Sequence, residues 1–267
     1  GKIGCHPGIV GKVDKSLMSS LRGIISVDKW VFGETADLNS IEHVKSIGQS
    51  AAGAHLRNLC AGCHLGNEKT KTGTSAWLER GGGCLACHLT YDKNALATLN
   101  QMRGRAKSVN VLPQFHPSIN LDISNDKCKS CHSRSGRISM NYEGWHETEL
   151  KPEQVKGRDN YQVLPDKRVF VKMPADIHQQ KGMLCVDCHG SYELMGDGKA
   201  YAHKEEAVKI QCSDCHTLKA NNRKLLAETD QETQLIAWSR KVKTEGVEVI
   251  LTQKDAKPLL NTIVQEQ

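Results

Sequence analysis

Five repeats of one short cysteine motif constrain this 267-residue chain more than any other feature of its sequence. Ten of the eleven cysteines form pairs whose thiols are separated by two residues, and a histidine directly follows the second cysteine of every pair. The motifs are Cys60, Cys63 and His64; Cys84, Cys87 and His88; Cys128, Cys131 and His132; Cys185, Cys188 and His189; and Cys212, Cys215 and His216. Histidine occupies only 12 positions of the chain, so five chance matches are not expected and the motif is a repeated chemical unit.

The spacing of the motif matches the chemistry of covalent haem attachment. Two thiols three positions apart can each form a thioether with one of the two vinyl groups of a single haem, and the next residue offers its imidazole to the iron. A zinc ribbon uses two cysteine pairs per metal and fixes no histidine after each pair, whereas an iron–sulfur cluster takes four cysteines at other spacings. A disulfide framework or a thioredoxin-type redox pair would not repeat one spacing five times. The motifs therefore predict five haem c groups.

The composition agrees with a core that side chains do not fill alone. Hydrophobic residues make up 38% of the chain and aromatic residues only 4%, which is little apolar material for 267 residues. We therefore expect a mainly irregular fold with a few α-helices and little β-structure, packed around haem. Charged residues of both signs make up 25%, which excludes a single-sign disordered tail. No run of 18 apolar residues occurs, so no transmembrane segment is predicted.

The segment from His178 through the motifs at Cys185 and Cys212 resembles the respiratory multihaem c-type cytochromes of anaerobic bacteria and archaea, and the resemblance covers roughly residues 1–220. It implies haems that are attached after export, stacked closely and used as an electron wire. The implied location is the periplasm or the cell exterior, and the implied partners are other redox proteins or terminal electron acceptors. The given sequence shows no charged and apolar leader, so we expect a mature chain whose signal peptide has been removed.

The histidines outside the motifs are candidates for the second axial positions. Near the start of the chain, Cys5 and His6 occupy the last two positions of a motif whose first position is Lys2. We expect a sixth haem there, held by one thioether and ligated by His6. Alternatively, Cys5 is an unpaired thiol and His6 is the distal ligand of another haem. With six haems, the distal set is His43, His55, His116, His146, His178 and His203.

The motif positions predict the organisation of the chain. Two di-haem cassettes lie around residues 55–90 and 178–217, each with a histidine before its first motif, and further haem sites lie near residues 5 and 130. We expect a multihaem domain over residues 1–220 and a haem-free tail over residues 221–267. Apolar spacing predicts helices over 37–59, 94–103 and 223–243, and residues 247–264 read as two short strands around a turn. Trp30, Trp77 and Trp145 are expected to pack against haem or in the core rather than to act as ligands.

The net charge bears on the partners. The protein without haem carries a formal charge of +6. Each ferric haem with two ionised propionates adds about −1, so the basic residues mainly balance propionates, and six haems bring the total to about zero. No interleaved basic and aromatic residues are seen, so nucleic-acid binding is not predicted.

Two classes of function fit the motifs. The first is an electron-transfer protein whose low-spin haems all have two histidine ligands. The alternative is a multihaem reductase of nitrite, hydroxylamine or a sulfur oxyanion, which needs one iron with an open position. The chain has no Cys-x-x-Cys-Lys motif and enough histidines for every iron, which favours the electron carrier over the enzyme. Within the first class, the resemblance also allows a homo-oligomer or an extracellular filament with haem contacts between subunits, and the sequence leaves this open.

Overall fold

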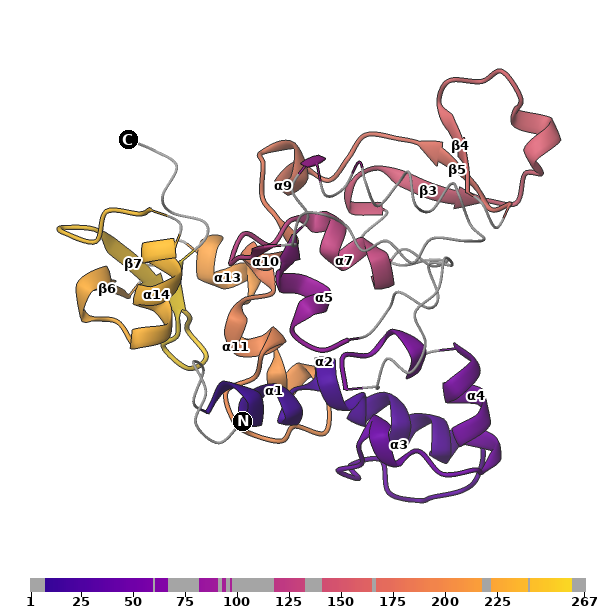
Figure 1. The fold of residues 1–267 in the computed structure, drawn as a ribbon, viewed down its shortest axis with the longest axis horizontal. Coiled ribbons are helices and arrows are strands. Elements are labelled where there is room, and N and C mark those ends of the chain that lie inside the picture. Colours follow the sequence, from indigo (N-terminus) through magenta and orange to yellow (C-terminus); the bar gives the residue numbers. More distant parts are fainter. Residues whose placement is uncertain are drawn as a thin grey trace. The chain divides into compact units, whose positions relative to one another are not determined.

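The computed structural model describes residues 8–59, 61–66, 82–90, 93–94, 97, 118–132, 141–164, 167–217, 222–239 and 241–260 (Figure 1). The chain divides into two compact units, of which the first comprises residues 1–123 and 189–267 and the second residues 124–188. The boundary falls inside a motif, between Cys188 and His189. The sequence-based division at residue 220 stays a prediction.

Three consecutive helices begin the described part of the first unit. Ser16 ends the first helix and accepts a hydrogen bond from the backbone N–H of Ser19, which caps the second helix. An apolar cluster of Leu21, Ile25, Val44, Leu56 and Ala61 joins the third helix to residues before and within the first motif. The elements of this region are α1 (Ile9–Lys15), α2 (Leu17–Ser20), α3 (Arg22–Val31), η1 (Val44–Ser46), α4 (Ala51–Leu59) and η2 (Ala61–Cys63).

The predicted helix over residues 37–59 is wrong in its first half. The side chain of Asp37 accepts the N–H of Asn39 and the Nδ1 atom of His43 accepts the N–H of Lys45, so local polar contacts replace helical ones. The carbonyl oxygen of Gly48, before the helix that does form, lies 2.2 Å from where a Cβ on Gly53 would be. The close approach of these two backbone segments therefore requires glycine at position 53. Only α4, the last part of the predicted segment, is an α-helix.

The rest of the first unit up to its last motif consists of short elements. Strand β1 (Leu89–Thr90) pairs antiparallel with β2 (Ser118–Ile119), directly after the helix that carries the second motif. The helix predicted over 94–103 lies almost entirely outside the described residues. The short helices are α5 (Leu85–His88), α11 (Ser191–Leu194), α12 (Lys204–Ala207) and α13 (Cys212–Cys215).

The residues after the last motif form a small sheet with its own apolar cluster of Leu226, Ala237, Val249 and Leu260. The sheet has the antiparallel order β6 (Arg223–Leu225), β7 (Glu248–Leu251) and β8 (Pro258–Leu259). The two strands predicted within residues 247–264 are thus confirmed as β7 and β8.

The predicted helix over 223–243 is wrong at its start. Residues 223–225 extend to pair with β7, and η4 (Leu226–Glu228) follows. The side chain of Asp230 then accepts the N–H of Thr233, which starts α14 (Gln231–Ser239). The cap therefore decides where this helix begins.

The second unit contains a three-stranded antiparallel sheet that the sequence analysis did not predict. Its order is β3 (Trp145–Thr148), β5 (Val169–Lys172) and β4 (Tyr161–Val163), and Val169 and Phe170 in the central strand are buried. The Lys172 ammonium lies 4.9 Å from the ring centroid of Trp145. The unit also has α7 (Asn125–His132), η3 (Pro152–Val155), α9 (Ile177–Gln180) and α10 (Cys185–Cys188).

These short helices and small sheets, mixed with irregular segments, agree with the coarse fold class predicted from the sequence, whereas packing around haem stays a prediction. Trp145 is half-buried, Trp30 is 52% exposed and Trp77 lies outside the described residues. Among the residues that the model describes, no helix is long and apolar enough to span a membrane.

Candidate haem sites

The motifs share helical backbone, as a single short turn in four of them and as part of the eight-residue helix α7 in the motif at Cys128. Helices α10 and α13 run from the first to the second cysteine of their motifs, α5 follows Cys84 directly, and α7 ends at His132. The first motif has the 3-10 turn η2, although Cys60 itself is outside the described residues. On a helical turn, side chains three and four positions apart lie on the same face. Both thiols and the following imidazole of one motif are thereby brought to one side.

Backbone hydrogen bonds close these turns. The N–H of His88 donates to the carbonyl of Cys84 at 3.0 Å, and the N–H of His216 donates to the carbonyl of Cys212 at 2.8 Å. Each of the last two motifs also has an aspartate before its second cysteine. The carboxylate of Asp187 accepts the N–H of Leu184, and that of Asp214 accepts the N–H of Gln211. The sequence shows these aspartates, but their capping role is seen only in the structure.

Two of the motifs lie next to each other within the second unit. The backbone N–H of Cys185 donates to the side-chain oxygen of Asn125, at 2.8 Å, which joins the start of α10 to the start of α7. The hydroxyl of Tyr142 donates to the carbonyl of Met183, just before α10, and burial raises the pKa of Tyr142 to about 12, so this donor stays protonated. The sequence pairs the motif at Cys185 with that at Cys212, whereas these contacts join it to the motif at Cys128.

In two of the motif histidines, the Nδ1 atom of the imidazole makes a hydrogen bond within the protein. Nδ1 of His88 lies 2.9 Å from the carbonyl oxygen of Asn120, and Nδ1 of His189 lies 2.8 Å from Oε1 of Glu193. Both oxygens only accept hydrogen bonds, so Nδ1 carries the proton and Nε2 keeps the lone pair with which an imidazole binds a metal. A metal-ligating histidine ordinarily makes this kind of hydrogen bond.

Two of the predicted distal histidines have the same arrangement with aspartates. Nδ1 of His55, on α4, lies 2.9 and 3.1 Å from the two carboxylate oxygens of Asp28, on α3. Nδ1 of His178 lies 2.9 Å from Oδ1 of Asp176, which also accepts the backbone N–H of His178. These contacts, the backbone one first, lower the pKa of Asp176.

Two other distal candidates have different hydrogen bonds. Nδ1 of His43 accepts the N–H of Lys45, its Nε2 is buried 3.6 Å from Oδ1 of Asp14, and burial lowers the pKa of His43. Nε2 of His203 donates to the side-chain oxygen of Asn39 at 3.0 Å. In these positions neither ring presents an Nε2 lone pair, so ligation through Nε2 would require each ring to change its hydrogen bonds.

The remaining candidates are placed only in part. His146 is half-buried on β3, in register with Val171 of β5. Cys5, His6 and His116 lie outside the described residues. Across the described ranges, no group of three or more histidine, cysteine, aspartate or glutamate side chains could hold a bare metal ion.

One cavity lies beside the second motif. It has a volume of about 520 Å³, and Cys84 and the adjacent Gly83 line it together with Leu65 and Gly66, which follow the first motif. Asp14 and Lys45 form an ion pair on its wall, at 2.8 Å. Pockets of a few hundred to about 1,000 Å³ hold cofactors. The cavity is therefore large enough for a flat group tethered at Cys84.

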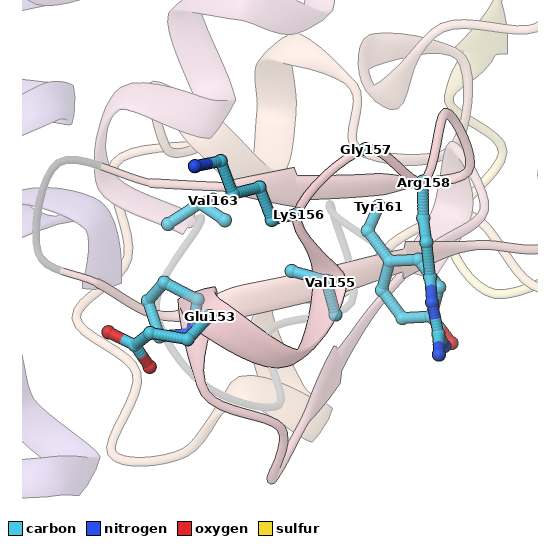
Figure 2. Close-up of a pocket in the computed structure, with 8 residues that line it drawn as sticks. Glu153, Val155, Lys156, Gly157, Arg158, Tyr161 and Val163 are labelled. Atoms are coloured by element: carbon cyan, nitrogen blue, oxygen red, sulfur yellow. The ribbon is translucent and has the colours of Figure 1, made fainter.

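A second cavity, of about 430 Å³, is lined by neither cysteine nor histidine. Figure 2 shows it beside η3 and β4, where the guanidinium of Arg158 lies 5.7 Å from the ring centroid of Tyr161 and Val155 and Val163 contribute apolar surface. Since it offers no thiol and no imidazole, we assign no haem to it.

The residues present fit haem c in the chemistry of their donors. Cysteines 84, 188, 212 and 215 are exposed, and cysteines 87, 128, 131 and 185 are half-buried, so the thiols of four motifs are accessible in part or in full. The segment that precedes the motif at Cys185 has exposed apolar side chains, including Met173, Ile177 and Leu184. A macrocycle bound there would cover apolar surface that is otherwise unfavourably hydrated.

Comparison with known proteins gives one family. Residues 151–237 match the family described as Cytochrome c-type protein NrfB-like, and this segment contains the motifs at Cys185 and Cys212. Searches of curated proteins and of solved structures give no significant match. Together with the five motifs, the match over this segment supports a relationship to the multihaem c-type cytochromes and electron transfer by covalently bound haem.

Proposed function

We propose that the chain conducts electrons along five to six covalently bound, low-spin haem c groups with two histidine ligands each. The observation that carries this proposal is the helical turn at the motifs, which brings two thiols and one imidazole to a single face. The turn recurs at separate places in both units, as a series of electron carriers requires.

The residues of each motif have separate tasks. The two thiols would tether the group covalently, and the motif histidine would bind its iron through Nε2. A distal histidine would be the second ligand of the iron, which would leave no position for a substrate. Haem supplies a one-electron couple between ferric and ferrous iron, and two imidazole ligands without methionine favour a low reduction potential.

The contact between α7 and α10 supports short electron-transfer steps. Because Asn125 accepts the N–H of Cys185, the turns that carry Cys128 and Cys185 are neighbours in the second unit. Groups tethered to these two turns are expected to lie close together, so the motif at Cys128 belongs to the same electron path as the motif at Cys185.

Our proposal for location and partners rests on the resemblance to the multihaem c-type cytochromes. We propose an exported chain, in the periplasm or outside the cell, that exchanges electrons with other redox proteins or a terminal acceptor. The filament hypothesis concerns only how copies of the chain assemble, and it needs no change in the ligands of each haem except where a neighbouring copy supplies a distal histidine.

Binding of small ligands to the iron tests the proposal. With every iron closed by two histidines, carbon monoxide added to the reduced protein and cyanide added to the oxidised protein should leave the absorption spectra almost unchanged. A high-spin signal equal to one haem, together with turnover of nitrite, hydroxylamine or sulfite, would instead establish the reductase alternative. If no haem remained attached to the chain after denaturation, both the electron-carrier proposal and the reductase alternative would be refuted.

A further inference from the structure

We propose that Asp28 is a positioning residue for His55: its carboxylate holds the proton on Nδ1 of the ring and so leaves the Nε2 lone pair available to bind a haem iron. This inference rests on the proposed haem function and adds a residue that no motif contains. Asp28 and His55 are 27 positions apart in the sequence and meet only because two helices pack together.

The packing of α3 against α4 makes the contact well defined. Ile25 of α3 and Leu56 of α4 are both fully buried and belong to the same apolar cluster. Asp28 is three positions after Ile25, and His55 directly precedes Leu56, so burial of the apolar pair sets the distance between the carboxylate and the ring. The Asp28 side chain is 14% exposed and that of His55 is 42% exposed. The acceptor is therefore sheltered, and part of the ring remains accessible.

The direction of the hydrogen bond determines which nitrogen can bind iron. Carboxylate oxygens at 2.9 and 3.1 Å accept the proton on Nδ1, which leaves the lone pair of the neutral ring on Nε2. A carboxylate in this position also makes the imidazole a stronger electron donor. A stronger donor stabilises ferric over ferrous iron, so Asp28 is expected to lower the reduction potential of the haem that His55 binds.

The surroundings of His55 fit a large apolar ligand. The ring centroid of Phe32 is 5.4 Å from that of His55. Phe32 and Val31 follow Asp28 by one helical turn, Leu59 follows His55 by one turn, and these three side chains are 44%, 66% and 49% exposed. Apolar side chains gathered around an accessible imidazole mark a place where apolar surface is covered by a partner. A porphyrin offers both an apolar face for these side chains and an iron for the imidazole.

Replacement of Asp28 by asparagine tests the electronic role. The amide oxygen can still accept from Nδ1, so the ring stays oriented while the negative charge is lost. We expect one reduction potential to rise in a spectroelectrochemical titration of the holoprotein, with the haem content unchanged. The matched control is Glu42→Gln. It removes a carboxylate that pairs with Lys29, the neighbour of Asp28 on α3, and it should leave the reduction potential unchanged.

Replacement of His55 by glycine tests the ligand itself. We expect one haem to become high-spin and to bind carbon monoxide, and added imidazole should return it to the low-spin form, which loss of packing alone would not allow. If the haem belongs to the same chain as His55, the wild-type protein should stay low-spin at every protein concentration. If it belongs to a second copy, dilution of the wild-type protein should produce the same high-spin signal.

Two results would overturn the inference while the proposed function stands. They are a His55→Gly protein with all haems low-spin, and an Asp28→Asn protein whose potentials all equal those of the wild type. Failure of the proposed function would be seen separately, as wild-type protein without covalent haem or with an open iron.

Discussion

Oδ1 of Asp214, within the last motif, accepts the backbone N–H of Gln253 in the turn between β7 and β8, at 2.8 Å. The other oxygen accepts the N–H of Gln211, and the side chain is 1% exposed. The amide of Gln253 in turn donates to the carbonyl of Ser213. One buried carboxylate thus caps the turn that carries Cys212 and joins it to the C-terminal sheet.

Replacing Asp214 by alanine should destabilise the protein and reduce haem attachment at Cys212 and Cys215. Two backbone N–H groups lose a charged acceptor, and hydrogen bonds to charged groups contribute about 1.5–3 kcal/mol each. We expect a loss of about 3 kcal/mol in the free energy of unfolding, measured by urea denaturation. Asp126→Ala is the control, because the Asp126 side chain is 86% exposed. If Asp126→Ala lowered the free energy of unfolding by as much, the two hydrogen bonds of Asp214 would not explain its effect.

A buried lysine gives a prediction about acid stability. Nζ of Lys209, which is 5% exposed, lies 3.0 Å from Asp197 and 3.2 Å from Asp255. Burial alone would raise the pKa of Asp197, but hydrogen bonds from the N–H of Lys199, the hydroxyl of Tyr201 and Lys209 outweigh it and lower the pKa to about 2. Because the ordinary value is 3.8, this contribution to stability is present above about pH 4 and is lost as the pH falls toward 2.

The variant Asp197→Asn removes that contribution. We expect it to be less stable than the wild type at pH 7, and the difference between the two proteins should shrink between pH 4 and pH 2. Urea denaturation across this range measures it, with the exposed Asp122→Asn as control. A difference that stays constant down to pH 2 would mean that the Asp197 carboxylate does not titrate in this range.

The motif residues could be predicted from the sequence more fully than the helices, strands and tertiary contacts that surround them. The motif spacing is local, so one helical turn suffices to bring Cys212, Cys215 and His216 together. The pairing of Asp28 with His55 depends on tertiary packing and has no local signal. The helices before residue 32 had a readable signal in Val10, Val13, Leu17, Leu21 and Ile25, which recur at helical spacing. The strands of the second unit were missed, although Val169, Phe170 and Val171 of the central strand are residue types that favour strands.

Haem is also expected to act as part of the core. The described apolar clusters are small, and Met173, Ile177 and Leu184 near the motif at Cys185 remain 38–57% exposed. Changing both Cys185 and Cys188 to alanine removes the tethers that hold a macrocycle over this surface, whose burial stabilises by about 25 cal/mol per Å². We expect the double variant not to accumulate in stable form, as judged by yield and melting temperature. A double variant with unchanged melting temperature would contradict the haem-core hypothesis.

The last prediction concerns the number of haems. Cys5 and His6 occupy the positions of a second motif cysteine and a motif histidine, and Lys2 stands where the first cysteine would be. One thioether suffices to tether a macrocycle, and His6 offers the imidazole. With six haems, the 12 histidines divide equally into proximal and distal ligands, whereas a five-haem protein leaves two histidines and one thiol without a role. Intact mass under denaturing conditions, together with iron per chain, should give six covalent haems. Five haems, with Cys5 open to alkylation in the unfolded chain, would refute the sixth haem. His6 would then be either a distal ligand of another haem or not a ligand.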